Sequence, residues 1–139
     1  NVRRLIIDEM PTNPKYYERM SILLDEIIRE RKTEAKSYEE YLAKIVALTK
    51  KVRVPEGVAA YPSSLRTIAQ KALYDNLEQN EALALKLDEL ILASKQDGWL
   101  GNPKKQRQVR NAIQPALEKL SNQEFETIFE IIKNQHEYR

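Results

Sequence analysis

The sequence has no cysteine and only three glycines among its 139 residues. Without cysteine there is no disulfide framework and no thiolate-based metal site, and such a chain suits a reducing compartment. We therefore expect it to be cytoplasmic. Glycine is too scarce for the tight turns that join short strands, and no segment alternates apolar and polar residues, so the composition favours helices.

Histidine is scarce as well, because His136 is the only one in the chain. One histidine without any cysteine cannot complete a zinc site or a histidine-based catalytic triad. The glycines lie in three separate contexts and do not form the loop that cradles nucleotide phosphates. We therefore expect no catalytic residue, no cofactor-binding residue and no metal ligand, and we do not expect this chain to be an enzyme by itself.

Asp25, Glu34 and Lys36 resemble the two carboxylates and the lysine with which many nucleases hold Mg²⁺ and activate water. That chemistry needs the glutamate and the lysine on one face of a strand. On a helix, residues two positions apart point about 200° away from each other. We interpret these residues as part of a solvated charged surface.

Charge of neither sign dominates, since 23 Lys and Arg stand against 21 Asp and Glu and leave a net charge of +2. Such a small net charge gives no strong field to attract nucleic acid or an anionic membrane. No apolar run approaches the length of a membrane-spanning helix, and Asn1 to Ile7 is too short and too charged for a signal peptide. We expect a soluble protein with no membrane partner.

Apolar residues repeat at steps of three and four along most of the chain. This periodicity predicts an all-α protein, an irregular bundle of five to seven helices that includes one long N-terminal helix. The chain length fits one domain, so we expect residues 1–139 to form a single helical domain. The repeat is already present at Val2, Leu5 and Ile6, so we expect the chain to be a fragment of a longer protein.

The long helix is predicted to begin at Asn13-Pro14, where the asparagine can cap the helix and the proline suits its first position. A stripe of apolar residues follows at helical spacing: Tyr17, Met20, Leu24, Ile27, Ala35, Tyr38, Leu42, Ile45, Thr49 and Val52. We expect one continuous helix to the end of this stripe. As the alternative, Ser37 with Glu40 three residues later is a capping box that predicts a separate helix.

Local signals predict shorter helices in the rest of the chain. A loop is expected at Pro55 to Gly57. The helix starts are marked by capping residues: Ser64, Asn102-Pro103, and the capping box of Ser121 with Glu124. Pro115 interrupts the helix that begins at Asn102-Pro103, so we expect a bend near Asn111. The apolar faces of these helices, which include Leu73 and Leu87, are expected to form the core, and the C-terminal end is expected to be polar and frayed.

Local charge is uneven although the net charge is small. Acidic residues prevail from Asp75 to Leu92, whereas the segment Gly98 to Leu117 holds four cations and no acid: Lys104, Lys105, Arg107 and Arg110. A helical wheel places four residues in one exposed row, with Arg110 at its flank: Lys104, Arg107, Asn111 and Gln114. Such a row can contact DNA phosphates or a protein partner, and the alternative is a solubilising surface without a binding role.

Trp99 lies between Gly98 and Gly101, directly before this basic helix. Its side chain can be an exposed anchor for a partner, but we favour a buried tryptophan that closes the core at the end of the helix. The candidate DNA or partner contacts of the chain are therefore Lys104, Arg107, Arg110 and Trp99.

Five stretches of the sequence carry a resemblance to a known family: Leu5 to Tyr17, Tyr61-Pro62, Ala72 to Leu77, Lys95 to Asn102, and Ile131 to Tyr138. Together they resemble the C-terminal helical region of the R subunit, the motor and restriction subunit of type I restriction-modification enzymes. The resemblance spreads over essentially the whole chain. It implies a larger multidomain subunit with a nuclease domain and ATP-driven motor domains ahead of this region.

The resemblance also implies partners and an activity for that larger subunit. The parent is an ATP-dependent, site-specific deoxyribonuclease that uses ATP and Mg²⁺, translocates and cuts DNA, and works with methyltransferase (M) and specificity (S) subunits. None of the family's nuclease or ATP-binding motifs occurs in this chain, so none of their residues can be assigned here. We expect a docking scaffold that attaches the R subunit to the methyltransferase-specificity core, and the alternative is a module that binds the backbone of double-stranded DNA through the basic helix.

Overall fold

The computed structural model describes residues 1–34, 37–53 and 61–139, and in these it consists of helices and turns without a strand. The predicted all-α fold is therefore confirmed, with seven α-helices in the described residues. Their contacts form two compact units: unit 1 comprises residues 1–10 and 14–61, and unit 2 comprises residues 11–13 and 62–139. The loop predicted at Pro55 to Gly57 lies outside the described residues.

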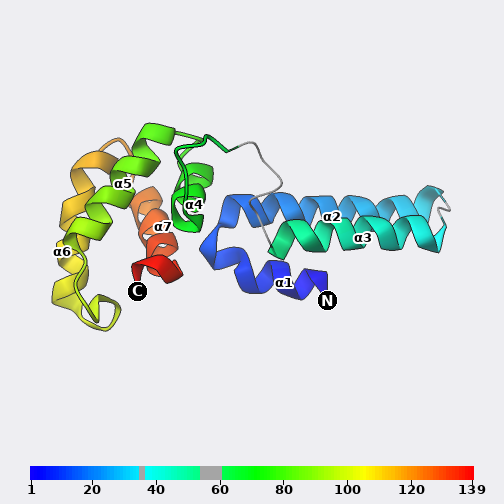
Figure 1. Ribbon diagram of the computed structural model, residues 1–139, viewed down its shortest axis with the longest axis horizontal. Helices are drawn as coiled ribbons and strands as arrows, with labels where there is room; N and C mark the ends of the chain where they lie inside the picture. Colours follow the sequence, from blue (N-terminus) through cyan, green and yellow to red (C-terminus); the bar gives the residue numbers. More distant parts are fainter. Residues whose placement is uncertain (35–36, 54–60) are drawn as a thin grey trace. The chain divides into compact units, whose positions relative to one another are not determined.

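The described residues of unit 1 form three α-helices: α1 (Val2–Glu9), α2 (Pro14–Glu34) and α3 (Tyr38–Arg53). The helices α2 and α3 run side by side as a hairpin, and α1 packs against both (Figure 1). As predicted, α2 begins at Pro14, and its 21 residues make it the longest helix of the described chain.

The prediction of one continuous helix to Val52 is wrong, and the alternative of a separate helix near Ser37 is correct. The Ser37 hydroxyl accepts a hydrogen bond from the backbone N–H of Glu40 at 3.2 Å, which starts α3 as a new helix. A single helix would leave the apolar residues of its second half without a partner. In the hairpin, Leu48 and Val52 are buried against α1 and α2 instead.

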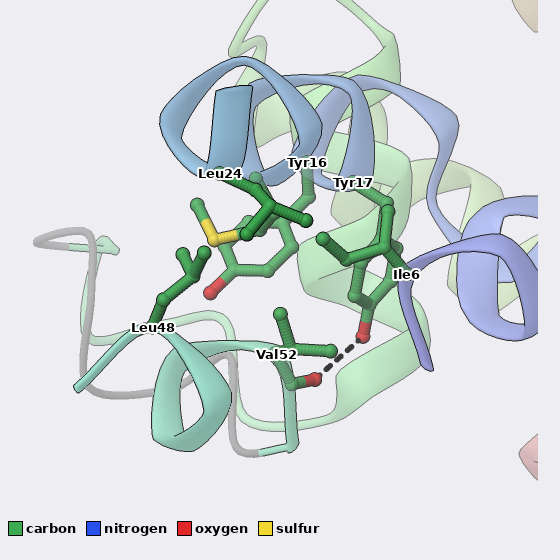
Figure 2. Packing of buried hydrophobic residues seen from close by; sticks show 7 residues of the cluster. Ile6, Tyr16, Tyr17, Leu24, Leu48 and Val52 are labelled. Carbon is green, nitrogen blue, oxygen red and sulfur yellow. Dashed lines mark hydrogen bonds between the residues drawn. The ribbon is translucent and has the colours of Figure 1, made fainter. Parts of the chain in front are cut away.

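The core of unit 1 gathers seven buried side chains: Ile6, Tyr16, Tyr17, Met20, Leu24, Leu48 and Val52 (Figure 2). The hydroxyl of Tyr16 donates to the backbone carbonyl of Lys51 at 2.7 Å, and that of Tyr17 donates to the carbonyl of Val52 at 3.2 Å. Carbonyls in the last turn of a helix have no partner within the helix. The two tyrosines therefore complete the C-terminal end of α3 from within the core.

Unit 2 contains four α-helices and three 3₁₀ turns: α4 (Ile68–Asn76), α5 (Glu81–Ser94), η3 (Trp99–Gly101), α6 (Pro103–Ile113), η4 (Gln114–Leu117), α7 (Asn122–Lys133) and η5 (His136–Tyr138). The helix α5 contacts both α4 and α6, and α7 contacts α4 (Figure 1). The predicted core positions Leu73 and Leu87 are confirmed, since both are fully buried.

Two of the predicted helix starts in unit 2 are confirmed and one is wrong. Ser121 and Glu124 form the predicted capping box, whose hydrogen bonds hold the pKa of the Glu124 carboxyl below its ordinary value. Ser64 does not cap α4, because Thr67 forms a capping box with Gln70 and the Ser64 hydroxyl donates to a carboxylate oxygen of Glu81. The confirmed start at Asn102 belongs to α6 and is described below.

Pro115 shortens α6 instead of bending it. The α-helix ends at Ile113, before the residue that precedes the proline, and the chain continues as the 3₁₀ turn η4. The expected bend near Asn111 is therefore replaced by a change of helix type. The physical reason is that the proline has no N–H for an α-helical hydrogen bond and its ring crowds the preceding turn.

The C-terminal end is held by two buried side chains, those of Gln135 and Tyr138, so the expected frayed end is wrong. Tyr138 is 1% exposed, and its hydroxyl donates to an Asp88 carboxylate oxygen at 2.5 Å. Its backbone carbonyl accepts from the indole N–H of Trp99 at 2.6 Å. Burial, followed by the bond to Asp88, raises the pKa of the Tyr138 hydroxyl. Gln135 is buried as well and donates to the carbonyl of Thr12 at 2.7 Å.

A second buried polar cluster lies in unit 2 around Asn13. Its side-chain amide donates to an Asp75 carboxylate oxygen at 2.9 Å, and its side-chain oxygen accepts from the Asn76 amide at 2.7 Å. Among the described residues, no buried side-chain nitrogen or oxygen atom lacks a hydrogen-bond partner. Buried polar groups with complete hydrogen bonding favour one arrangement of the surrounding helices over alternatives.

Candidate functional site

The basic helix α6 is fixed at its start and along one face. The side-chain oxygen of Asn102 accepts hydrogen bonds from the N–H groups of Lys104 and Lys105, at 3.0 and 3.2 Å. Val109 and Ile113 are fully buried. The opposite face therefore points to solvent, and the predicted exposed row is confirmed: Lys104, Arg107, Asn111 and Gln114 are all exposed.

The four cations of this segment are not equivalent. Among the described residues, the side chains of Lys104 and Arg107 make no hydrogen bond or ion pair. The Lys105 ammonium, in contrast, donates to the backbone carbonyl of Asp97 at 2.6 Å. Only Lys104 and Arg107 present a cation that is not already engaged in the fold.

Arg110 belongs to the packing of unit 2 more than to the exposed row. Both of its terminal nitrogens donate to the Glu126 carboxylate, one of them at 3.3 Å. Its guanidinium carbon lies 4.5 Å from the centre of the Phe129 ring. The hydrogen bond from Arg110 holds the pKa of the Glu126 carboxyl below its ordinary value. The prediction of Arg110 as a surface contact is weakened, because binding a phosphate would require it to leave Glu126.

Trp99 is not available as a surface contact, so that candidate is wrong and the interpretation as a core plug is confirmed. The side chain is 1% exposed and lies edge-on to the Phe129 ring, with the ring centres 6.3 Å apart. Gly98 makes this placement possible, because its φ of 72° lies in the left-handed region where a side chain would be strained.

The predicted acidic surface is also reduced by burial. Asp75 and Asp88 lie inside unit 2, where amide or hydroxyl groups donate to them. Glu78, Glu81 and Glu89 remain exposed. A carboxylate in the sequence has the same appearance whether it is solvated or buried, so the pattern of charges alone could not separate these two groups.

A second surface, which the sequence reasoning missed, lies on α3. Leu42 belongs to the apolar stripe found in the sequence but is 45% exposed, and Val46 is 48% exposed. They line an open apolar groove together with four other residues of the same helix: Glu39, Ala43, Ala47 and Lys50. A signal was present, because α3 carries apolar residues on two sides, and only one side can face α2.

Other candidates from the sequence do not assemble into a site. Asp25 forms an ion pair with Arg3 at 2.6 Å, and the side chains of Glu34 and Lys36 lie outside the described residues. In the part of the chain that the structure describes, no three carboxylates or histidines are grouped to hold a metal ion. None of the described helices is long and apolar enough to cross a membrane.

The stretches that carry the family resemblance have a folding role. They supply much of the buried polar network described above: Asn13, Asp75, Asn76, Trp99, Gln135 and Tyr138. Comparisons with protein-family models, with curated proteins and with solved structures find no match for this chain. The exposed row of α6 and the groove of α3 are thus the surfaces from which a function can be argued.

Proposed function

We propose that this chain is a helical docking domain, which attaches the DNA translocase and endonuclease of a type I restriction enzyme R subunit to its methyltransferase-specificity core. The observation that carries the proposal is the exposed row of α6, where two unengaged cations, Lys104 and Arg107, stand beside the amides of Asn111 and Gln114. The resemblance of five stretches to the R subunit supplies the identity of the partner.

The number of available cations favours a protein partner over duplex DNA. Proteins whose affinity depends on the DNA backbone make roughly six to ten phosphate contacts, each adding about 0.9 to the salt dependence of log K. Lys104 and Arg107 offer two, since Lys105 and Arg110 already have partners in the fold. A DNA-contacting module remains the second candidate, because these two cations are exposed on one helix face.

The way in which α6 is fixed within unit 2 also suits a docking role. Asn102 caps the helix, and Trp99, Val109 and Ile113 are buried beneath it, so the row is held on a rigid support. A rigid row of amides and cations is typical of the polar rim of a protein interface, where charge governs the rate of association more than the final affinity. The amides of Asn111 and Gln114 add hydrogen-bond donors and acceptors that a purely electrostatic DNA contact would not need.

The test is association of the chain with M and S subunits, comparing two variants with the same change in net charge. In the first, Lys104→Glu is combined with Arg107→Glu on the row. In the control, Lys86→Glu is combined with Lys119→Glu, both exposed but outside it. We expect the first variant to associate roughly tenfold more slowly and the control to match the unmodified chain. Equal association of both variants, or no complex at all, would contradict the proposal.

The DNA alternative is separated by its salt dependence. If Lys104 and Arg107 contact phosphates, changing both to alanine should flatten the slope of log K against log salt by about two units. We expect the isolated chain to bind DNA too weakly at physiological salt for such a slope to be measured.

We also expect the isolated chain neither to hydrolyse ATP nor to cut DNA. Turnover that persists through repurification would overturn that expectation.

A further inference from the structure

The outward face of α3 carries an apolar stripe that no described residue of unit 1 covers. Its members are Leu42, Ala43, Val46 and Ala47, all of them exposed. The opposite side of the helix is occupied, since Leu48 and Val52 are buried in the core. The stripe therefore faces away from α2, as an unpartnered face of the helical hairpin.

The spacing of the stripe residues is the same from both ends, and each pair of equivalent positions joins two different residues. Glu39 and Lys50 lie at its two ends, Leu42 and Ala47 lie one step inside them, and Ala43 and Val46 lie next to the centre. All three pairs are centred on one point, between Lys44 and Ile45. A helix with this pattern is complementary to its own copy when the copy runs in the opposite direction.

We propose that α3 is a self-association surface, on which a second copy of this chain packs with its α3 antiparallel. Leu42 of one copy is then level with Ala47 of the other along the helix pair, and Ala43 is level with Val46, so that each level of the interface combines a large side chain with a small one. Each alanine allows the helix backbones to approach closely. The pairing is isologous, because the same patch contributes from both copies about a two-fold axis.

The charges at the ends of the stripe select the antiparallel direction. In that direction Glu39 of each copy meets Lys50 of the other, which gives two pairs of opposite charge. In a parallel pairing Glu39 would meet Glu39 and Lys50 would meet Lys50, and like charges repel. The first turn of α3 is acidic and its last turn is basic, so the antiparallel arrangement also joins complementary helix ends.

The stripe is short compared with the interface of a permanent dimer. We therefore expect a reversible dimer that forms between roughly 1 µM and 1 mM, and sedimentation velocity over this range measures it. The inference does not depend on the proposed docking role of α6, which lies in unit 2. A chain that stays monomeric over the whole range would overturn it.

The central substitution is Ala43→Glu, which places a charge on each side of the two-fold axis. We expect the dimer to weaken by at least about 30-fold, while the helical circular-dichroism signal is unchanged because glutamate is a good helix former and the site is exposed. The matched control is Lys51→Gln, which changes the charge of α3 by the same amount outside the stripe. A dimer that survives Ala43→Glu, or is lost equally in the control, would contradict the assigned surface.

A charge swap tests whether the partner is a second copy. Glu39→Lys alone, or Lys50→Glu alone, should weaken the dimer roughly tenfold, because each replaces two attractive pairs with two repulsive ones. The double variant restores opposite charges in both pairs and should regain the original affinity. Failure of the double variant to recover would show that Glu39 and Lys50 do not meet across the interface.

The absence of cysteine allows a direct test of direction. A mixture of Glu39→Cys chains with Lys50→Cys chains should form a disulfide-linked mixed dimer under mild oxidation. Neither chain alone should do so, because the two introduced thiols would lie about 16 Å apart along an antiparallel pair. Efficient linkage of Glu39→Cys chains to one another would indicate a parallel pair and overturn the proposal.

Discussion

The two units of this chain differ in what they bury and in what they leave exposed. Unit 1 is built from apolar contacts among three helices, whereas unit 2 also buries carboxylates and amides: Asp75, Asp88, Asn13 and Gln135. Of the seven large apolar side chains exposed in the described residues, five belong to unit 1: Ile7, Ile22, Tyr38, Leu42 and Val46. The buried hydrogen bonds of unit 2 thus restrict its helices to one arrangement. Unit 1 exposes more apolar surface, and covering that surface would be favourable.

The largest expected effect comes from opening the core of unit 2. Leu87→Ala should lower the free energy of unfolding by about 2 to 5 kcal/mol, because this side chain is fully buried. Leu92→Ala on the same helix is the control, since Leu92 is 52% exposed and its loss should cost under about 1 kcal/mol. Hydrogen exchange should then rise in residues 62–139 more than in residues 14–53. An equal rise in both ranges would mean that the two units do not unfold as separate parts.

The next largest effect is a difference in unfolding free energy between two variants, each of which removes one tyrosine hydroxyl, one from each unit. Tyr138→Phe removes the donor to the buried Asp88 carboxylate and should cost about 1 to 3 kcal/mol. Tyr17→Phe removes a donor to the Val52 carbonyl, a neutral acceptor, and should cost about 1 kcal/mol. Chemical denaturation of both variants measures the difference. Equal losses would show that the buried network of unit 2 contributes no more than the tyrosine caps of unit 1.

Alkaline pH gives a smaller change within unit 1. Burial, with a further contribution from Glu9, raises the pKa of Tyr17 to about 12, from an ordinary value of 10.0. A raised pKa means that the stabilisation is fully present below pH 10 and is lost as the pH rises toward 12, because the unfolded chain ionises first. The stability advantage of the unmodified chain over Tyr17→Phe should therefore shrink across this window. An advantage that stays constant to pH 12 would argue that Tyr17 is not buried in solution.

The smallest expected effect concerns the surface of unit 2. Arg110→Ala removes an ion pair and a contact with an aromatic ring, and should cost about 0.5 to 1 kcal/mol, whereas Lys104→Ala should change stability little. The pKa of Glu126 should also return toward its ordinary value in the variant. Because that pKa is lowered in the folded chain, the contribution of the pair is present at neutral pH and is lost as the pH falls through it. An NMR titration of Glu126 that is unaffected by Arg110→Ala would remove Arg110 from the packing of unit 2.

Local signals predicted much of this fold, and contacts distant in sequence account for what they missed. The starts at Pro14 and Pro103 and the capping box at Ser121 need only adjacent residues, and all three are confirmed. The break between α2 and α3 was predicted only as the alternative, because a capping box such as Ser37 with Glu40 is also compatible with the middle of a helix. Of the candidate site, the exposed row was predictable from helical spacing.

The engagement of Arg110 and the burial of Asp88 were not predictable in this way. Both depend on partners brought together by the tertiary fold, since Arg110 meets Glu126 on another helix and Asp88 meets Tyr138 from the end of the described chain. A single sequence contains the residues of such pairs but no local spacing that joins them. The same limit explains why Trp99 had two interpretations until its burial was known.

The hydrogen bonds of the two units also set an order in which the protein can fold. The Tyr16 hydroxyl and the Lys51 carbonyl of unit 1 are 35 positions apart, whereas Gln135 and Thr12 of unit 2 are 123 positions apart. Longer loops cost more entropy to close and slow the formation of such contacts. As a ribosome makes the chain from its N-terminus, the helical hairpin of unit 1 can form as soon as α3 has emerged. The network of unit 2 must wait until Tyr138 has emerged, so a pause in synthesis before that residue leaves a folded hairpin followed by an open second unit.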